Sequence, residues 1–282
     1  EDDGDFSTAI GFEALKAQTG TSGTVANTAV GHHALTRLTT GTMNTAVGQA
    51  SQDYNRTGVN NTSVGKESLS QLGHDDSDNN TAVGFQAMRS AGTPNNNDAA
   101  QNVAVGSKAL TAILDGDNNV AVGYLAGAAI TTGGQNTILG AYAGDAMTTM
   151  SNCILIGYNA GTAINNNVAN GTTIVGRDAG ERLTNGTKNT AMGYSALTGN
   201  HQGGHNTVIG YESARGVTDN AHSYNSAVGY RSLYAVTSGG SNTVMGYLAG
   251  SALTTGGNNT ALGANALKTS IDVQYAVAIG ES

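Results

Sequence analysis

Tryptophan, proline and cysteine are almost missing from this chain of 282 residues. It has no Trp, one Pro, one Cys and three Phe, and 11% of its residues are charged, against about 25% in an ordinary globular domain. A single cysteine forms no disulfide within the chain, which excludes a disulfide scaffold. One proline excludes collagen, and so few large aromatic side chains argue against an ordinary globular core.

Basic residues and long apolar runs are scarce too. Twelve Lys and Arg against twenty Asp and Glu give a formal net charge of −8, whereas nucleic-acid-binding proteins carry clustered basic residues on one face. We therefore expect no nucleic-acid partner. No apolar run approaches the roughly 20 residues of a bilayer-spanning helix, so we expect no membrane insertion by this segment.

Glycine is abundant instead, and it closes a repeated phrase of the type Asn-Thr-Ala-Val-Gly. The phrase occurs 16 times, with closing glycines from Gly11 to Gly280. Ten of the 15 intervals between these glycines are 17 residues long, and the others are 19 to 22. Such a period predicts one continuous repeat domain over residues 1–282.

Each copy predicts a short β-strand that ends at its glycine. The residue before the glycine is aliphatic in every copy, and a β-branched residue usually stands two positions earlier, as is typical of strands. Thr28 and Val30 then share one face and Ala29 takes the other. Neither face is charged, so we expect both to be buried or half-buried. The Ala-rich face suits an interior shared between chains.

A second inward-facing column follows each glycine. The third residue after it is Ala or Ser in all 15 copies that reach that far, and the fourth is commonly Leu or Gly. We expect a second short strand here. A 17-residue unit with two short strands and two turns fits one rung of a parallel β-solenoid of about 16 rungs. The longer intervals carry loop-type sequence, which predicts insertions at one turn.

Asparagine opens the phrase in 12 of 16 copies. Such a column fits either an amide ladder between rungs or a turn residue chosen for its backbone bonding. Cys153 replaces Asn in one copy, where it fits a small buried thiol. The repeat is defined by Asn27, Val30, Gly31, Asn44, Val47, Gly48, Asn119, Val122, Gly123, Asn189, Met192, Gly193, Asn259, Leu262 and Gly263.

The phrase Asn-Thr-Ala-Met-Gly-Tyr-Ser-Ala-Leu at residues 189–197 resembles the head repeats of trimeric autotransporter adhesins (YadA-like), which are also found in phage tail fibres. The resemblance covers nearly the whole chain. It implies a left-handed β-roll that assembles as a homotrimer and serves attachment. The adhesin head repeat is shorter than the 17 residues found here. The chain ends within a repeat, so we expect a fragment of a longer fibre.

Enzyme and metal signatures are weak, and we expect no catalytic residue, cofactor or metal. His201 and His205 have ligand-like spacing but no third ligand nearby, and adjacent His32 and His33 would point opposite ways on an extended stretch. The acidic turns at 75–78 and 115–118 lack the terminal bidentate Glu of a calcium loop. Solvated acidic turns are the better interpretation.

One column has two interpretations, because half of the copies place an aromatic residue directly after the glycine. These residues form either a contact stripe for sugars or proteins or a structural stack between rungs. The candidate contact residues are Tyr124, Tyr158, Tyr194, Tyr211, Tyr230 and Tyr247. A Thr array can also bind ice, but the Thr column shares its face with Val30 and its equivalents, which favours inward placement.

The sequence therefore predicts a non-enzymatic, extracellular fibre or adhesin segment. It would bind a glycan or protein receptor as part of a phage tail fibre or a bacterial surface adhesin. A self-assembling filament, in which open rung edges pair end to end, is the alternative from another class. An ice-binding solenoid is a further alternative.

Overall fold

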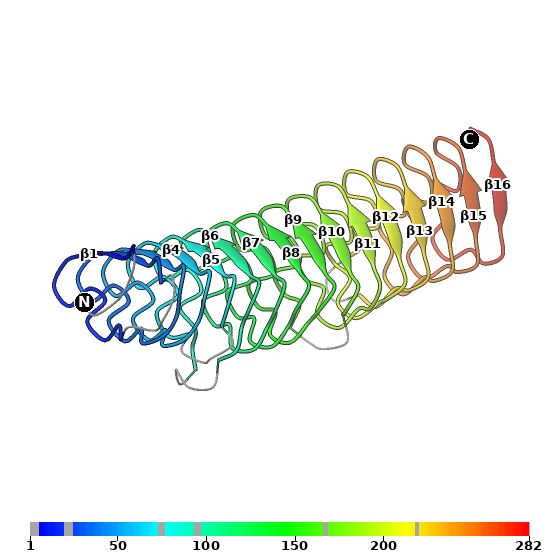
Figure 1. Cartoon of the computed structure of the whole chain (residues 1–282). Coiled ribbons are helices and arrows are strands. Elements are labelled where there is room, and N and C mark those ends of the chain that lie inside the picture. Colours follow the sequence, from blue (N-terminus) through cyan, green and yellow to red (C-terminus); the bar gives the residue numbers. More distant parts are fainter. Residues whose placement is uncertain are drawn as a thin grey trace. The chain divides into compact units, whose positions relative to one another are not determined.

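The computed structural model describes residues 6–19, 25–72, 77–92, 97–165, 169–217 and 220–281. These residues form sixteen strands of three residues each, and the described part of the chain contains no helix. The strands belong to two compact units, residues Glu1–Ala141 and Tyr142–Ser282. In each unit the chain coils repeatedly, and every coil carries one strand (Figure 1). The acidic stretch expected at 75–78 lies partly outside the described residues.

The strands have the bounds that the repeated phrase predicts. In the first unit they are β1 Thr8–Ile10, β2 Thr28–Val30, β3 Thr45–Val47, β4 Thr62–Val64, β5 Thr81–Val83, β6 Val103–Val105, β7 Val120–Val122 and β8 Thr137–Leu139. In the second they are β9 Ile154–Ile156, β10 Thr173–Val175, β11 Thr190–Met192, β12 Thr207–Ile209, β13 Ser226–Val228, β14 Thr243–Met245, β15 Thr260–Leu262 and β16 Val277–Ile279.

Within each unit every strand pairs in parallel with the next strand in the sequence. Equivalent residues face each other, so that Ala29 pairs with Ala46 and Ala191 with Val208. The arrows of β9–β16 lie side by side in Figure 1. In-register pairing of consecutive coils is the pattern of a parallel β-solenoid, which confirms the predicted parallel β-solenoid architecture.

The closing glycine is fixed by the close approach of neighbouring coils. Gly31 has a φ of +140°, and a Cβ there would lie 2.5 Å from the carbonyl oxygen of Gly48. An L side chain fits neither this backbone conformation nor this spacing. The strand therefore ends at a glycine in every rung, as the repeat predicts.

The core lies on the Ala-rich side of the sheet, which corrects one prediction. Ala29, Ile138 and Ile174 at the strand centres are fully buried within their own unit. The flanking Thr and aliphatic residues point outward and are half-buried or exposed in the chain. The alternation of faces is as predicted. The Ala-rich face, however, fills the interior of its own chain and is not shared with another.

The Ala or Ser column after each glycine is buried, as predicted, but it does not lie on a strand. Ala34 and Ala196 are fully buried, yet the surrounding residues form turns. In this segment His33 has a φ of +61° and Leu35 a φ of +50°. Residues in the left-handed region on either side of Ala34 break the extended backbone. Each coil therefore has a single strand.

Candidate functional site

The outward face of the sheet is an apolar surface in both units. It consists of the first and third residues of each strand, a Thr column and an aliphatic column. Val64 and Val122 in the first unit are 39% and 37% exposed, and Met192 and Met245 in the second are 42% and 46% exposed. We call this surface the outward sheet face. Apolar side chains in such contiguous columns are unusual on a protein surface and mark interaction sites.

The placement of the Thr column overturns the prediction that it points inward. Thr28 and Thr45 are half-buried and Thr62 is exposed, and they stand opposite one another in consecutive strands. By size and polarity, the bulky aliphatic column is the expected core. The small residue at the strand centre is the true inward position, because the buried Leu or Met after the glycine fills the space beside it.

The aromatic column forms a stack of rings in the second unit. Tyr194 and Tyr211 lie 5.0 Å apart between ring centroids, and Tyr211 and Tyr230 lie 5.4 Å apart. Tyr230 and Tyr247 continue the stack at 5.3 Å, and the three pairs are within 16° of parallel. Parallel stacking covers the ring faces and leaves the edges exposed. This geometry favours the structural interpretation, because sugars bind aromatic side chains by stacking on their faces.

Two tyrosines of the predicted contact stripe lie outside this stack. Tyr158 meets Tyr142 edge to face at 5.8 Å, with the ring planes 81° apart. Tyr124 is 45% exposed. Arg177 lies 5.7 Å from the Tyr158 ring centroid and 5.9 Å from that of Tyr194. These distances suit a cation–π contact that bridges the two rungs.

The Asn column is an amide ladder, and it bonds the turns as well. The Asn27 Oδ1 accepts a hydrogen bond from the Asn44 backbone N–H at 2.9 Å. The Asn27 Nδ2 donates to the Gly41 carbonyl at 2.8 Å. The same pair of bonds recurs along both units: the Asn189 Oδ1 accepts from the Asn206 backbone N–H at 3.0 Å, and the Asn189 Nδ2 donates to the Gly203 carbonyl at 3.0 Å. The Asn189 Oδ1 also accepts from the Asn206 Nδ2 at 3.0 Å, which is the amide-to-amide bond of a ladder. Both structural interpretations of this column are therefore correct.

Cys153 and Thr172 stand in the Asn column of two consecutive rungs. The Cys153 thiol is buried and donates to the carbonyl of Ala169 at 3.6 Å. Burial raises the pKa of this thiol, so it is protonated at neutral pH and is a poor nucleophile. The buried Thr172 Oγ1 has no hydrogen-bond partner among the residues that the structure describes.

The histidines that the structure describes are not arranged as metal ligands. Contrary to the prediction, His32 and His33 point the same way, with ring centroids 4.1 Å apart and planes 8° from parallel. The reason is the left-handed backbone of His33, which has a φ of +61°. His205 stacks on Tyr224 at 5.0 Å, and His201 lies beside Thr184. The described residues hold no cluster of three or more potential metal ligands.

The described part of the acidic turns bonds to the backbone of neighbouring rungs. The Asp117 Oδ1 accepts from the Ala100 N–H at 2.8 Å, and the Asp115 Oδ1 accepts from the Asp98 N–H at 3.5 Å. The Asp78 Oδ1 accepts from the Val59 N–H at 2.6 Å. These carboxylates accept hydrogen bonds from the backbone N–H groups of neighbouring rungs. This agrees with the interpretation of these segments as acidic turns.

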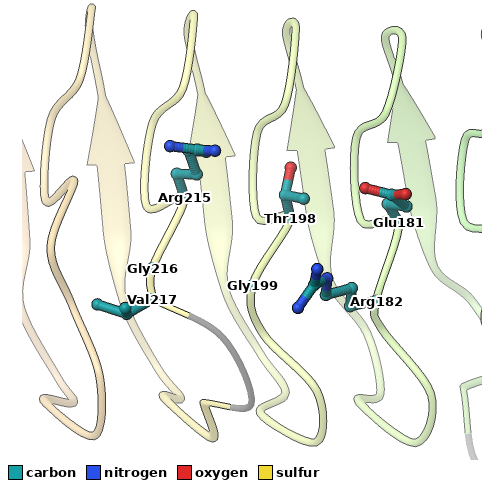
Figure 2. Close-up of a pocket in the computed structure, with 7 residues that line it drawn as sticks. All are labelled: Glu181, Arg182, Thr198, Gly199, Arg215, Gly216 and Val217. Carbon is teal, nitrogen blue, oxygen red and sulfur yellow. The ribbon is translucent and has the colours of Figure 1, made fainter.

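A hollow of about 230 Å³ opens on the second unit, away from the predicted residues. It is lined by Glu181, Arg182, Thr198, Gly199, Arg215, Gly216 and Val217. Figure 2 shows that these residues belong to three successive rungs and lie on the segments in front of the strands. The sequence does carry a signal for it. The sixth residue after the closing glycine is itself a glycine in only two repeats, which are consecutive: Gly199 and Gly216.

No helix among the described residues is long and apolar enough to span a membrane. A comparison with models of protein families and with curated protein sequences gives no match for this chain. The features that bear on its function are therefore its own: the solenoid, the outward sheet face, the tyrosine stack and the hollow.

Proposed function

We propose that this chain is a non-enzymatic structural segment of an extracellular attachment fibre, built as a homotrimer. The observation that carries the proposal is the apolar outward sheet face. Parallel sheets are almost always covered on both faces, and in one chain only the inner face is covered. A second and third copy of the chain would cover the outer face.

The chemistry of this face supports self-association. Val64, Val122 and Ile209 expose aliphatic side chains without any charged residue in the strands. Because the strands of each unit are in register, these side chains form straight columns. Columns of identical side chains on three copies can pack together along their length. The threefold number and the left-handed coil come from the resemblance to trimeric adhesin heads.

Attachment follows from such an assembly. A trimer presents every loop and surface three times, so weak contacts with a glycan or protein receptor combine into avidity. The fibre would belong to a phage tail or to a bacterial surface adhesin. Attachment depends on the shape and surface of the assembly and requires no catalytic residue or cofactor.

Sedimentation of the purified chain and of the variant Val122→Glu tests the proposal. Val122 points outward, so a glutamate there spares the core of the chain but places like charges in the shared interior. We expect the parent to sediment as a trimer. The association constant of the variant should be lower by at least about tenfold, so that more of the variant sediments as a monomer. Thr132→Glu is the matched control, because Thr132 is an exposed residue outside the strands.

A trimer that is unchanged by Val122→Glu would place the interface elsewhere, and a monomeric parent would overturn the trimer. Open-ended polymers that grow with concentration would favour the self-assembling filament. Sedimentation therefore separates the closed fibre from the filament.

The outward Thr column favours a second candidate, an ice-binding solenoid. Thr45 and Thr62 lie on the outward face in register, which removes the reason to reject this function on the sequence alone. Ice binding and trimer formation use the same face and exclude each other. A monomeric chain that lowers the freezing point of water below its melting point would support ice binding, and a trimer without this effect would dismiss it.

A further inference from the structure

The hollow on the second unit is built by an irregular rung. Gly210 and Gly229 are 19 residues apart, and the extra length falls after Arg215. Asn220 forms an isolated bridge with Asn200 of the preceding rung, and its side chain is bonded to the Val236 carbonyl at 2.9 Å. Asn220 therefore occupies the buried position where the sequence register would place Val217. Val217 itself is 55% exposed.

Gly199 forms the floor of the hollow, and the backbone of the next rung packs directly against it. A Cβ there would lie 2.7 Å from the carbonyl oxygen of Arg215 and 2.8 Å from that of Val217. No side chain fits at this point. Both carbonyl oxygens lie beside the floor, and a carbonyl oxygen accepts two hydrogen bonds. The Arg215 carbonyl already accepts from the Gly199 N–H at 2.7 Å, and the Val217 carbonyl accepts from the Asn220 Nδ2. Each oxygen therefore has one further acceptor position for a hydroxyl group of a ligand.

Two arginines stand on opposite sides of the floor. Arg182 extends toward Gly199 from one side, and Arg215 lies on the other (Figure 2). Arg182 is exposed and has no ion pair or side-chain hydrogen bond with any residue that the structure describes. Its guanidinium keeps all five donors for a ligand. An arginine with no internal partner beside a cavity is suited to bind a carboxylate.

Arg215 is held in place by its own contacts. Its Nη1 donates to the Tyr234 hydroxyl at 2.7 Å, and its Nε lies 4.0 Å from the Glu212 Oε1. Glu212 is 8% exposed and also accepts from the Arg231 Nε at 2.6 Å. This arrangement presents a positioned guanidinium at the edge of the hollow. The unoccupied donors of that guanidinium remain for a ligand.

The balance of charge selects a ligand with one negative charge. Arg182, Arg215 and Glu181 line the hollow and together carry one net positive charge, and the adjoining Glu212 is paired with Arg231. Glu181 lines the hollow itself and disfavours a ligand that carries two negative charges. A carboxylate would be accepted better than a phosphate dianion.

The remaining polar groups suit hydroxyls. The Thr198 hydroxyl donates to the Asp178 carbonyl at 2.9 Å, so its oxygen can accept from a ligand. The Glu181 carboxylate and the two floor carbonyls are further acceptors. A volume of about 230 Å³ is below the range of about 300–1,000 Å³ that accommodates drug-sized ligands. One sugar residue is a ligand of the right size.

We infer that this hollow binds the sugar acid of a glycan, a monosaccharide residue with one carboxylate and several hydroxyls. Arg182 would bind the carboxylate, and Thr198, Glu181 and the floor carbonyls would bind the hydroxyls. The biological use of such a site rests on the proposed attachment function, because it names the receptor chemistry. The binding itself does not require the trimer.

Titration of the full chain with glucuronate, with glucose as the neutral sugar, tests this inference by calorimetry. We expect glucuronate to bind at least about tenfold more tightly than glucose, because a charge-assisted pair to arginine is lost with the carboxylate. Arg182→Gln should weaken glucuronate binding by about tenfold or more. Lys188→Gln is the matched control, because Lys188 is exposed and in the same rung, and it should bind as the parent does.

Equal binding of glucuronate and glucose would overturn the carboxylate site, and so would an Arg182→Gln variant that binds as the parent does. Inorganic sulfate that displaces glucuronate with equal affinity would show a general anion site and would overturn the sugar assignment. A trimer that does not bind glucuronate would overturn this inference and leave the fibre standing. A monomer that binds it would overturn the trimer alone.

Discussion

The Ile174 side chain fills the space that a side chain at Gly180 would need. A Cβ on Gly180 would lie 2.6 Å from the Ile174 Cδ1. The next rung solves the same packing problem with the sizes reversed, since it has Ala191 at the strand centre and Leu197 after the turn, both fully buried. In each of these two rungs one of the two positions carries a large side chain and the other a small residue. Close packing of the core explains this exchange.

Gly180→Leu should therefore destabilise the chain, and Ile174→Ala should relieve the effect. The single substitution overpacks the core at a cost of about 1–3 kcal/mol. The double variant reproduces the pair Ala191 and Leu197 of the next rung, so we expect a favourable coupling energy of about 1–3 kcal/mol. Urea unfolding of the parent, the two single variants and the double variant measures it. Additive effects would contradict the exchange of volume.

Thr172→Asn should stabilise the second unit. Thr172 interrupts the Asn ladder, and its buried Oγ1 forms no hydrogen bond within the described part of the chain. An asparagine there would accept from the Asn189 backbone N–H and donate to the Gly186 carbonyl, as Asn189 does toward Asn206 and Gly203. We expect a gain of about 0.5–1.5 kcal/mol in urea unfolding. Thr269→Asn, at an exposed turn, is the control and should change little.

His222 should make the second unit less stable in acid. Burial lowers the pKa of His222 to about 4, from an ordinary value of 6.5. No described residue forms a hydrogen bond with its buried Nε2. The folded chain favours neutral His222. The contribution of this histidine to the stability of the fold is therefore complete above pH 6.5 and is lost as the pH falls from 6.5 toward 4. The loss reaches about 3 kcal/mol below pH 4.

Unfolding midpoints of the parent and of His222→Met between pH 7 and pH 4 measure this effect. The variant should have a flatter pH profile in this range, because it lacks the titrating group. His201→Met is the control, since His201 is only half-buried, and it should keep the slope of the parent. Equal slopes in the parent and His222→Met would refute the assignment.

Tyr211→Leu should disrupt the tyrosine stack at its centre. Tyr211 contacts Tyr194 on one side and Tyr230 on the other, so the variant loses two ring pairs. We expect a loss of about 1–3 kcal/mol in stability and a weaker near-ultraviolet circular dichroism signal of coupled tyrosines. Tyr275→Leu, at a residue that is 77% exposed, should leave both unchanged. An equal change in the two variants would argue against a structural role for the stack.

The strands were predictable from the sequence because the repeat marks them sixteen times. Every strand ends directly before its closing glycine, as at Val30 and Met192. The inward face was not predictable from polarity. Thr and Val look more like core residues than Ala does, but Ala29 leaves room for Leu35 to enter the interior from the turn. Which face of the strand points inward depends on how the side chains pack across the rung.

The local backbone and the irregular rungs were harder to predict. The left-handed residue His33 turns its ring onto that of His32, and no residue type signals this conformation. Gln52 is fully inside the first unit, where it donates to Ser63 and accepts from Asn55 at 3.0 Å. The sequence indicates this cluster, because Gln52 and Ser63 stand at repeat positions where Leu and Ala are common in the other copies. Arg182 and Arg215, by contrast, are brought to one hollow by stacking alone.

Each strand contacts only the strands before and after it in its unit. Removal of residues 32–48 would let Thr28 pair with Thr62 in the way that it now pairs with Thr45, without any new type of core. A coding sequence that repeats the same phrase also favours unequal recombination between copies. Solenoids of this design can therefore evolve in length by whole coils, while the surface of the remaining coils stays unchanged.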